Sequence, residues 1–355
     1  MSANRIKIVG AGLIGTSLGL ALTKQGLDVG LENRSKANLR LAIEYGAGKE
    51  AEGEFELVIV CVSPEMTAEV VAQQLERHPE ALVTDVASVK AEISREVQRL
   101  SPANASRYVG SHPMAGREKG GPGAARADLF FARPWVITPS GGNATEAVER
   151  LKNLAMQLSA LPVVMSAEEH DRAVALVSHL PQLVSSALAA RLNGGNEQQL
   201  SLSGQGLRDT SRIASSDPDL WLQILSQNAQ LVVPLLEEFK GDLEQLLVSL
   251  GNLEAPGALA KLHGLLERGN SGVSRIPGKH GGKFVDYQLV TVVIDDSPGS
   301  LASLLTFIGD VGVNIEDLKL EHSPGAQIGL VEIQVVPEAL ERLSEQLTEN
   351  GWRLV

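Results

Sequence analysis

The chain has 355 residues, and its 43 acidic against 31 basic side chains give a formal net charge of −12 at pH 7. This length predicts two or three domains. The acidic balance argues against a nucleic-acid or anionic-membrane partner, because both require clustered Lys and Arg. The single cysteine, Cys61, rules out an intrachain disulfide and a cysteine-based zinc site. We expect Cys61 to be a buried packing residue and the protein to hold no metal.

No apolar run in the sequence approaches the roughly 20 residues that span a membrane. Residues 1–4 leave no room for a signal peptide before the first strand. We therefore expect a cytoplasmic protein.

The first 165 residues alternate short apolar strands with amphipathic segments. The expected strands are Ile6–Val9, Asp28–Leu31, Leu57–Val62, Leu82–Asp85, Tyr108–Gly110 and Trp135–Thr138. Near-continuous apolar strands separated by helices indicate a parallel sheet that is covered on both faces.

A glycine-rich turn, residues 10–15, joins the first strand to an apolar helix. Gly10, Gly12 and Gly15 fall where a tight turn, a close backbone approach to a pyrophosphate and helix-on-strand packing each require a missing side chain. The order of strand, turn and helix predicts an α/β Rossmann-type nucleotide-binding domain over residues 1–165. The other expected cofactor contacts in this domain are Leu13, Ile14, Glu32, Arg34, Ser63 and Asp85.

The second strand ends at Glu32, where an acidic side chain can accept hydrogen bonds from the adenosine ribose. Glu32 favours NAD over NADP, because a 2′-phosphate would meet its carboxylate. Arg34 and Lys36 follow at once and could clamp such a phosphate if Glu32 turned away. NADP is therefore not excluded.

Polar residues follow two strands where a packed fold would place apolar ones. The first loop, residues 85–90, contains Ser88, and the second contains His112. Ligands of open α/β sheets bind at the carboxyl ends of strands, so both loops should face the nicotinamide. His112 could take a hydroxyl proton as hydride leaves the same carbon, since its ordinary pKa lies near working pH. Ser88 could hydrogen-bond that hydroxyl or fix the imidazole. A capped loop histidine is the alternative for His112.

The pattern changes at Ser166, which with Glu169 fits a capping box that opens a long helix. Residues 166–268 are predicted to form an all-α domain. A second helix start is Asp217 before Pro218, followed by a helix over Leu220–Leu250 with a kink at Pro234. Long apolar helices of this kind commonly bury one another across a subunit interface, so we expect a homodimer.

The helical segment supplies polar groups for an anionic substrate. Arg208 and Arg212 lie four residues apart, on one face if the stretch is helical. An arginine can bind a carboxylate through two hydrogen bonds, although a solvated surface pair is the alternative. His179 and Gln182 flank the helix-breaking Pro181 in an apolar helix. A satisfied core histidine is the alternative for His179.

Residues 269–284 are rich in glycine and are predicted to be a linker. Its basic residues suit a solvated hinge or a binding role, and they are Arg275, Lys279, His280 and Lys283. Beyond it we expect strands over Tyr287–Ile294, Asn314–Glu321, Gln327–Val336 and Trp352–Val355, with helices over Pro298–Gly309 and Pro337–Asn350. The order βαββαβ predicts a ferredoxin-like domain over residues 285–355.

These stretches resemble the prephenate/arogenate dehydrogenase family of tyrosine biosynthesis. The resemblance spans residues 5 to about 280, in the family's order, and rests on residues 10–15, Asp85–Lys90, Gly110–Gly116, Ser178–Pro181 and Asp209–Trp221. The tail, with Asp295–Leu301 and Val311–Ile315, looks like an ACT domain, the amino-acid-binding regulatory module of some members.

The resemblance implies an oxidative decarboxylation, in which NAD takes hydride from the carbinol carbon of prephenate, carbon dioxide leaves and 4-hydroxyphenylpyruvate forms. By family analogy His112 accepts the hydroxyl proton, Ser88 assists it and Arg212 holds a substrate carboxylate. The residues that shape or gate the pocket in relatives correspond to Glu118, His179, Arg208 and Trp221.

Two positions depart from the family pattern. Arg117 stands where many relatives have a small hydroxyl residue, and Gln182 where several have a second histidine. Both would lie near the substrate side chain, so prephenate and arogenate both stay open as substrates.

The ACT-like tail implies an effector. Asp296, Gly299 and Asn314 match positions that bind amino acids in ACT pairs, and tyrosine is the expected ligand as end product. An ACT fold that only dimerises is the alternative. From another class, a catalytically silent NAD-linked amino-acid sensor would lack the base and the carboxylate clamp, whereas this chain has His112 and Arg212.

Overall fold

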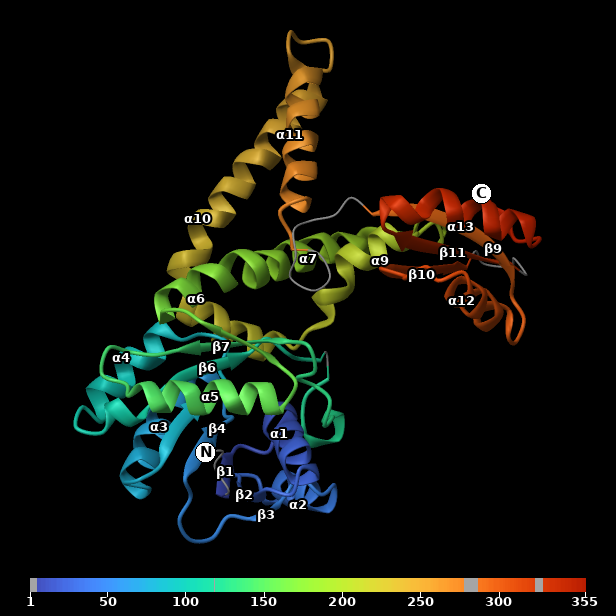
Figure 1. Ribbon diagram of the computed structural model, residues 1–355. Coiled ribbons are helices and arrows are strands. Elements are labelled where there is room, and N and C mark those ends of the chain that lie inside the picture. Colours follow the sequence, from blue (N-terminus) through green and yellow to red (C-terminus); the bar gives the residue numbers. More distant parts are fainter. Residues whose placement is uncertain (1–4, 118, 278–286, 323–327) are drawn as a thin grey trace. The chain divides into compact units, whose positions relative to one another are not determined.

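The computed structural model describes residues 5–117, 119–277, 287–322 and 328–355 (Figure 1). The chain forms two compact units, residues 1–240 and 241–355. The division falls inside a long helix, α10 (Pro218–Gly251), and not at the predicted linker.

The first unit begins with a five-stranded sheet in the order β3-β2-β1-β4-β5, in which every pairing is parallel. Its strands are β1 (Arg5–Val9), β2 (Asp28–Glu32), β3 (Lys49–Glu50), β4 (Leu57–Val60) and β5 (Leu82–Asp85). The helices that follow them are α1 (Leu13–Lys24), α2 (Lys36–Glu44), α3 (Pro64–Arg77) and α4 (Ala91–Leu100). Separate apolar clusters form around α1 and around α3 and α4, which confirms the predicted Rossmann-type sheet with two covered faces.

Two of the predicted strands do not join this sheet. Strand β6 (Gly110–Pro113) pairs antiparallel with β7 (Pro134–Thr138), and β7 pairs parallel with β8 (Leu161–Val164). A single parallel bridge between Val83 and Tyr108 connects this second sheet to the first. The expectation of one parallel sheet is wrong here, because β6 and β7 are joined without the crossover helix that a parallel return requires. Helix α5 (Thr145–Gln157) provides that crossover between β7 and β8.

The short 3-10 helices of this part are η1 (Ala105–Arg107) and η2 (Pro122–Ala124). Cys61, directly after β4, packs against the core beside α1 as expected, but it is only partly buried.

Helix α6 (Ala167–Val174) opens on the predicted capping box. The Ser166 Oγ accepts from the Glu169 N–H at 3.2 Å, and a Glu169 carboxylate oxygen accepts from the Ser166 N–H at 2.9 Å. The chain continues through η3 (Ala175–His179), a π-helical turn, into α7 (Leu180–Arg191). The wider turn lies directly before Pro181, whose ring does not fit a regular α-helical turn.

The helical part then contains η4 (Leu192–Gly194), α8 (Glu197–Leu200), α9 (Gln205–Ser211) and η5 (Arg212–Ser215) before α10. Asp217 caps α10, since its carboxylate accepts from the Asp219 N–H at 3.0 Å. A single helix continues past Pro234.

Among the described residues, the stretch Ala167–Gly194 is long and apolar enough to cross a membrane by length and composition alone, although the sequence predicted no such run. Its side chains His170, Asp171 and His179 are buried and bonded to neighbouring segments. Such contacts are typical of a helix that packs within a folded domain.

The second unit contains the end of α10, helix α11 (Ala258–Val273) and a sheet domain. Helix α11 ends five residues inside the predicted linker 269–284, so the predicted start of the linker is wrong. One glycine costs a helix only about 1 kcal/mol, and the glycines at 269 and 272 do not end this one. Lys279, His280 and Lys283 lie outside the described residues.

The sheet domain has the predicted βαββαβ order. Its elements are β9 (Gln288–Asp295), α12 (Ser300–Asp310), β10 (Asp317–His322), β11 (Ile328–Val335), α13 (Pro337–Glu349) and β12 (Arg353–Leu354). The strands lie in the order β10-β11-β9-β12, with all pairs antiparallel, around one apolar cluster. This is the predicted ferredoxin-like topology.

Candidate active site

The glycine turn after β1 is shaped by its lack of side chains. Gly10 has a positive φ of 110°, and a Cβ there would lie 2.2 Å from the Cys61 carbonyl oxygen. A Cβ on Gly15 would lie 1.9 Å from the Gly10 carbonyl oxygen. Both glycines are therefore required by the protein itself.

Gly12 is different, because a Cβ there would meet no atom within 4 Å. It precedes α1 and no side chain caps the helix. The first N–H groups of α1, from Leu13 and Ile14 onward, can therefore donate to an incoming anion. This open helix end fits the pyrophosphate of a dinucleotide.

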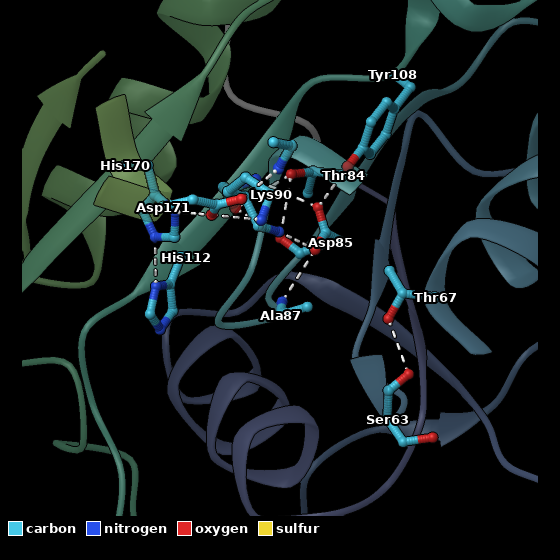
Figure 2. A network of polar contacts seen from close by, with 12 residues as sticks. Ser63, Thr67, Thr84, Asp85, Ala87, Lys90, Tyr108, His112, His170 and Asp171 are labelled. Atoms are coloured by element: carbon cyan, nitrogen blue, oxygen red, sulfur yellow. Dashed lines mark hydrogen bonds and ion pairs between the residues drawn. The ribbon is translucent and has the colours of Figure 1, made fainter. Parts of the chain in front are cut away.

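Glu32 lies beside this turn, at the end of β2, where the Gly10 N–H donates to its carbonyl oxygen at 2.8 Å. Its carboxylate accepts from Lys7 Nζ at 2.8 Å and from Arg77 at 2.9 Å. Partial burial opposes ionisation of Glu32, but Lys7 and Arg77 outweigh it and lower its pKa. Arg34 is exposed two residues further on. Ser63 precedes α3, and its carbonyl oxygen accepts from Thr67 Oγ1 at 3.0 Å (Figure 2).

Asp85, at the end of β5, is the centre of a buried polar cluster (Figure 2). Its carboxylate forms an ion pair with Lys90, and both side chains are fully buried. The Tyr108 hydroxyl and the Ala87 N–H each donate to it at 2.9 Å. Asp85 was predicted to contact the cofactor; in the structure its carboxylate accepts hydrogen bonds from protein donors and holds the 85–90 loop in place.

His112 is held by a second histidine and not by Ser88. His112 Nδ1 lies 2.8 Å from His170 Nε2, and His170 Nδ1 lies 2.8 Å from Asp171 Oδ1 (Figure 2). Ser88 is half-buried on the neighbouring loop, and no hydrogen bond joins it to His112 in the described structure. One role predicted for Ser88 was to fix the imidazole of His112. In the structure His170 makes that contact.

Asp171 connects this pair to the nucleotide-binding domain. Its two carboxylate oxygens accept from the backbone N–H groups of Lys90 and Ala91, both at 2.8 Å, at the start of α4. Burial opposes its ionisation, but the hydrogen bonds from His170, Ala91 and Lys90 outweigh burial and lower its pKa. Asp171 is therefore a carboxylate that caps α4 from a distant helix.

The environment of His112 disfavours its charged form. Burial lowers the pKa of His112 well below its ordinary value, and repulsion from His170, Lys90 and His179 lowers it further. His112 is therefore neutral at physiological pH. Part of its side chain remains accessible, and Figure 2 shows its second ring nitrogen on the side away from His170.

His179 and Gln182, predicted to contact substrate, are buried and satisfied by the protein. His179 is 1% exposed, its Nδ1 lies 3.1 Å from Asn228 Nδ2, and its ring meets the Trp221 ring edge-on. Burial lowers its pKa to about 4. Gln182 hydrogen-bonds Ser186 and Ser216. The satisfied core histidine, the alternative for His179, is the arrangement observed.

The predicted arginines are at the surface. Arg208 lies in α9, and Arg212 begins η5, which packs against α7. Arg117 is exposed and donates to the Ala124 carbonyl oxygen at 3.0 Å. Glu118 lies outside the described residues.

Comparison with known families shows the family to which the chain belongs. Residues 18–164 match the nucleotide-binding domain of prephenate dehydrogenase, and residues 166–263 match its dimerization domain. The chain belongs to the prephenate dehydrogenase family. The predicted dehydrogenase with a Rossmann-type nucleotide-binding domain and a helical domain is thereby confirmed.

Individual relatives agree with this assignment. The chain is 37% identical to the probable prephenate dehydrogenase NovF of Streptomyces niveus, over 97% of this chain and 98% of the relative. It is also similar to the crystal structure of Synechocystis arogenate dehydrogenase, with 28% identity, a TM-score of 0.63, and coverage of 76% of this chain and 99% of that one. A prephenate dehydrogenase from Aquifex aeolicus, solved with hydroxyphenyl propionate and NAD+, shares the fold at 24% identity and a TM-score of 0.66, over 76% of this chain and 99% of that one.

The family match ends before the ferredoxin-like domain, where three effector residues were predicted. Asp296 and Gly299 lie in the exposed turn between β9 and α12, and Gly299 has a positive φ of 94°. Asn314 lies in the loop before β10, and its Nδ2 donates to Glu316 at 2.6 Å.

Sequence reasoning missed the residues that support His112 in this prephenate dehydrogenase family member, namely His170 and Asp171. A signal was present: in a helix that begins at Ala167, they share the buried stripe with Val174 and Ala175, at spacings of three to five residues. Polar side chains at core positions of a helix require hydrogen-bond partners, and here the partners are in the candidate active site. Among the described residues, no group of His, Cys, Asp or Glu could hold a metal ion.

Proposed function

We propose that this protein is an NAD-dependent prephenate dehydrogenase that converts prephenate to 4-hydroxyphenylpyruvate by oxidative decarboxylation. The observation that carries the proposal is the neutral His112, held through Nδ1 by His170 with its other ring nitrogen available. A neutral imidazole with one free nitrogen is suited to accept a hydroxyl proton.

The 85–90 loop, which β6 contacts, and the nucleotide turn lie at the same edge of the five-stranded sheet. Val9, Val60 and Asp85 are in register at the carboxyl ends of β1, β4 and β5, so the glycine turn and the 85–90 loop share one edge of the sheet. The Ser111 N–H donates to Asp85 at 3.4 Å, which places β6 and His112 beside the same loop. A substrate at this edge can meet the nicotinamide and His112 together.

Bound NAD would supply the hydride acceptor. His112 would accept the proton of the ring hydroxyl, and Ser88 on the adjacent loop would donate to or accept from the same hydroxyl. Arg212 would hold a substrate carboxylate, with Arg208 and Trp221 near the pocket entrance.

Glu32 supports NAD as the cofactor. Lys7 and Arg77 hold its carboxylate in the ionised form at the end of β2. A fixed carboxylate accepts hydrogen bonds from ribose hydroxyls and repels a 2′-phosphate. Arg34 and Lys36 could bind such a phosphate, so NADP is the weaker alternative.

Arogenate is the alternative substrate, and the likeness to an arogenate dehydrogenase supports testing it. Of the two departures from the family pattern, Gln182 is buried and bonded, while Arg117 is exposed. Arg117 is therefore the better candidate for contact with the substrate side chain, and its positive charge favours the keto group of prephenate over the ammonium group of arogenate.

Three further features belong to the proposal. The ferredoxin-like domain would act as an ACT module that binds tyrosine near Asp296, Gly299 and Asn314. The matched dimerization domain and the exposed leucines of α7 and α10, among them Leu188 and Leu222, support a homodimer. The enzyme would act in the cytoplasm.

The test is nicotinamide reduction by purified protein with prephenate or arogenate, NAD or NADP, with and without tyrosine. We expect turnover with prephenate and NAD, inhibited by tyrosine. His112→Asn should lower kcat far more than it raises KM, whereas Arg212→Gln should chiefly raise KM. Absence of turnover with either acid, together with NAD binding, would instead support the silent sensor.

A further inference from the structure

The ring of His170 and the carboxylate of Asp171 are aligned behind His112, the proposed base. The His112 and His170 rings meet edge-on, with centroids 5.1 Å apart and planes at 75°, so a ring nitrogen of each is directed at the other. His170 and Asp171 are 1% and 3% exposed, which leaves their hydrogen bonds little competition from water.

The donors and acceptors along this chain can be assigned. Asp171 is ionised and can only accept, so His170 Nδ1 must donate to it. In neutral His170 the Nε2 atom then carries a lone pair and accepts from His112 Nδ1–H. The proton of neutral His112 is therefore on Nδ1, and its Nε2 is the atom left free to act as a base.

We infer that His170 is a positioning residue that fixes the reactive tautomer of His112 and then takes over its proton. The inference rests on the proposed function of His112. The substrate hydroxyl gives its proton to His112 Nε2, while bound NAD would supply the hydride acceptor. His112 Nδ1 passes its own proton to His170 Nε2, so His112 becomes neutral again and His170 becomes an imidazolium beside the Asp171 carboxylate.

The surroundings explain why the charge belongs on His170. The charged and titratable groups that act on the pair are Lys90, Asp171 and His179, and Lys90 is itself ion-paired with Asp85. His112 is close to the Lys90 cation and carries no carboxylate partner, whereas His170 is hydrogen-bonded to Asp171. An opposite charge in direct contact stabilises an imidazolium, and His170 has such a contact with the Asp171 carboxylate.

Two substitutions at His170 separate positioning from a general structural role. His170→Leu removes the acceptor for His112 Nδ1–H, and we expect kcat to fall by roughly 10²–10⁴-fold, the usual contribution of general-base catalysis. His170→Gln offers Oε1 as an acceptor but cannot take the proton, and we expect it to recover about 10-fold or more of that loss. NAD affinity, which depends on the glycine turn, should be unchanged in both.

The pH dependence of kcat/KM distinguishes the two roles, because a purely structural role of His170 would not shift the acid limb. In the wild type the acid limb of kcat/KM belongs to the His112–His170 pair. In His170→Gln only the hard-to-protonate His112 remains, so the acid limb should move down by about one pH unit or more. Equal kcat in wild type and His170→Leu, or an acid limb that stays in place in His170→Gln, would overturn the inference.

Nitrogen-15 NMR tests the tautomer without any turnover. The chain has seven histidines, and the His112 signals can be assigned by their loss in His112→Gln. We expect a neutral ring protonated on Nδ1 at pH 8 in the wild type and a mixture of tautomers in His170→Leu. A ring protonated on Nε2 in the wild type would refute the relay. Lack of turnover with a Nδ1-protonated ring would refute only the proposed function.

Discussion

The fully buried ion pair between Asp85 and Lys90 makes a strong prediction about stability. Lys90→Met removes the ammonium but retains most of the side-chain volume, so packing changes little. The Asp85 carboxylate then stays buried with three neutral donors, from Tyr108, Ala87 and Ser111. Removing one partner of a buried ion pair lowers the free energy of unfolding by about 3–5 kcal/mol. Because three donors to Asp85 remain, we expect a loss of about 3 kcal/mol here.

The cost is measurable as a shift in thermal unfolding. The first unit has about 240 residues, and for a domain of that size 1 kcal/mol corresponds to roughly 2–4 °C. Lys90→Met should therefore lower the Tm of this unit by about 6–12 °C in differential scanning calorimetry. Addition of NAD should raise the Tm of both proteins, which identifies the transition that belongs to the nucleotide-binding domain.

The control is the double variant Lys90→Met, Asp85→Asn, which removes both charges. Because the penalty in the single variant is an uncompensated charge, the double variant should be more stable than Lys90→Met by at least about 1 kcal/mol. The prediction would be wrong if Lys90→Met melted within about 2 °C of the wild type. It would also be wrong if the stability loss of the double variant equalled the sum of the losses of Lys90→Met and Asp85→Asn.

Three other predictions follow from the site. Gly15→Val should abolish NAD binding by calorimetric titration, because its Cβ would lie 1.9 Å from the Gly10 carbonyl oxygen, while the open Gly142→Ala should bind normally. Glu32→Ser should shrink the ratio of kcat/KM for NAD over NADP by roughly 10-fold or more, since it removes a charged acceptor and frees Arg77; an unchanged ratio would contradict this. The folded chain holds the His179 pKa at about 4, below its ordinary value of 6.5, so the unfolded chain binds the proton first and stability falls as pH drops between these values, by roughly 3 kcal/mol. The Tm of His179→Gln should therefore fall less than the Tm of the wild type when the pH is lowered from 7 to 5. An equal fall in both proteins would contradict a buried, neutral His179.

Local signals in the sequence were sufficient to predict where the main turns and helix starts of the first unit lie. The glycine turn, the capping box at Ser166 and the cap at Asp217 each depend on residues within a few positions of one another. Their geometry is dictated by backbone sterics and by unsatisfied N–H groups, which are properties of the segment itself. The βαββαβ order of residues 288–354 was predictable for the same reason.

Contacts over long sequence separations were not predictable in this way. His112 and His170 are 58 residues apart, and Asp171 meets Ala91 across 80 residues. Whether β7 runs parallel or antiparallel to β6 depends on the connection between the two strands, not on their own apolar residues. For His179 and Gln182 the sequence alone could not separate a ligand contact from a buried hydrogen bond, because a polar group in an apolar helix suits both equally well; in the structure both side chains are buried and hydrogen-bonded.

The placement of Asp171 links the proposed base to the architecture of the first unit. One carboxylate holds the start of α4, and with it the 85–90 loop, and also accepts from His170. The α-helical segment thus contributes to the site from behind the base, through a group that is itself inaccessible to substrate. Burial makes His112 a poor place for a proton, and the same burial strengthens the attraction between His170 and Asp171. The low polarity around the base and the charge behind it are therefore complementary: the first keeps His112 neutral and ready to accept, and the second gives the accepted proton a stable position one ring away.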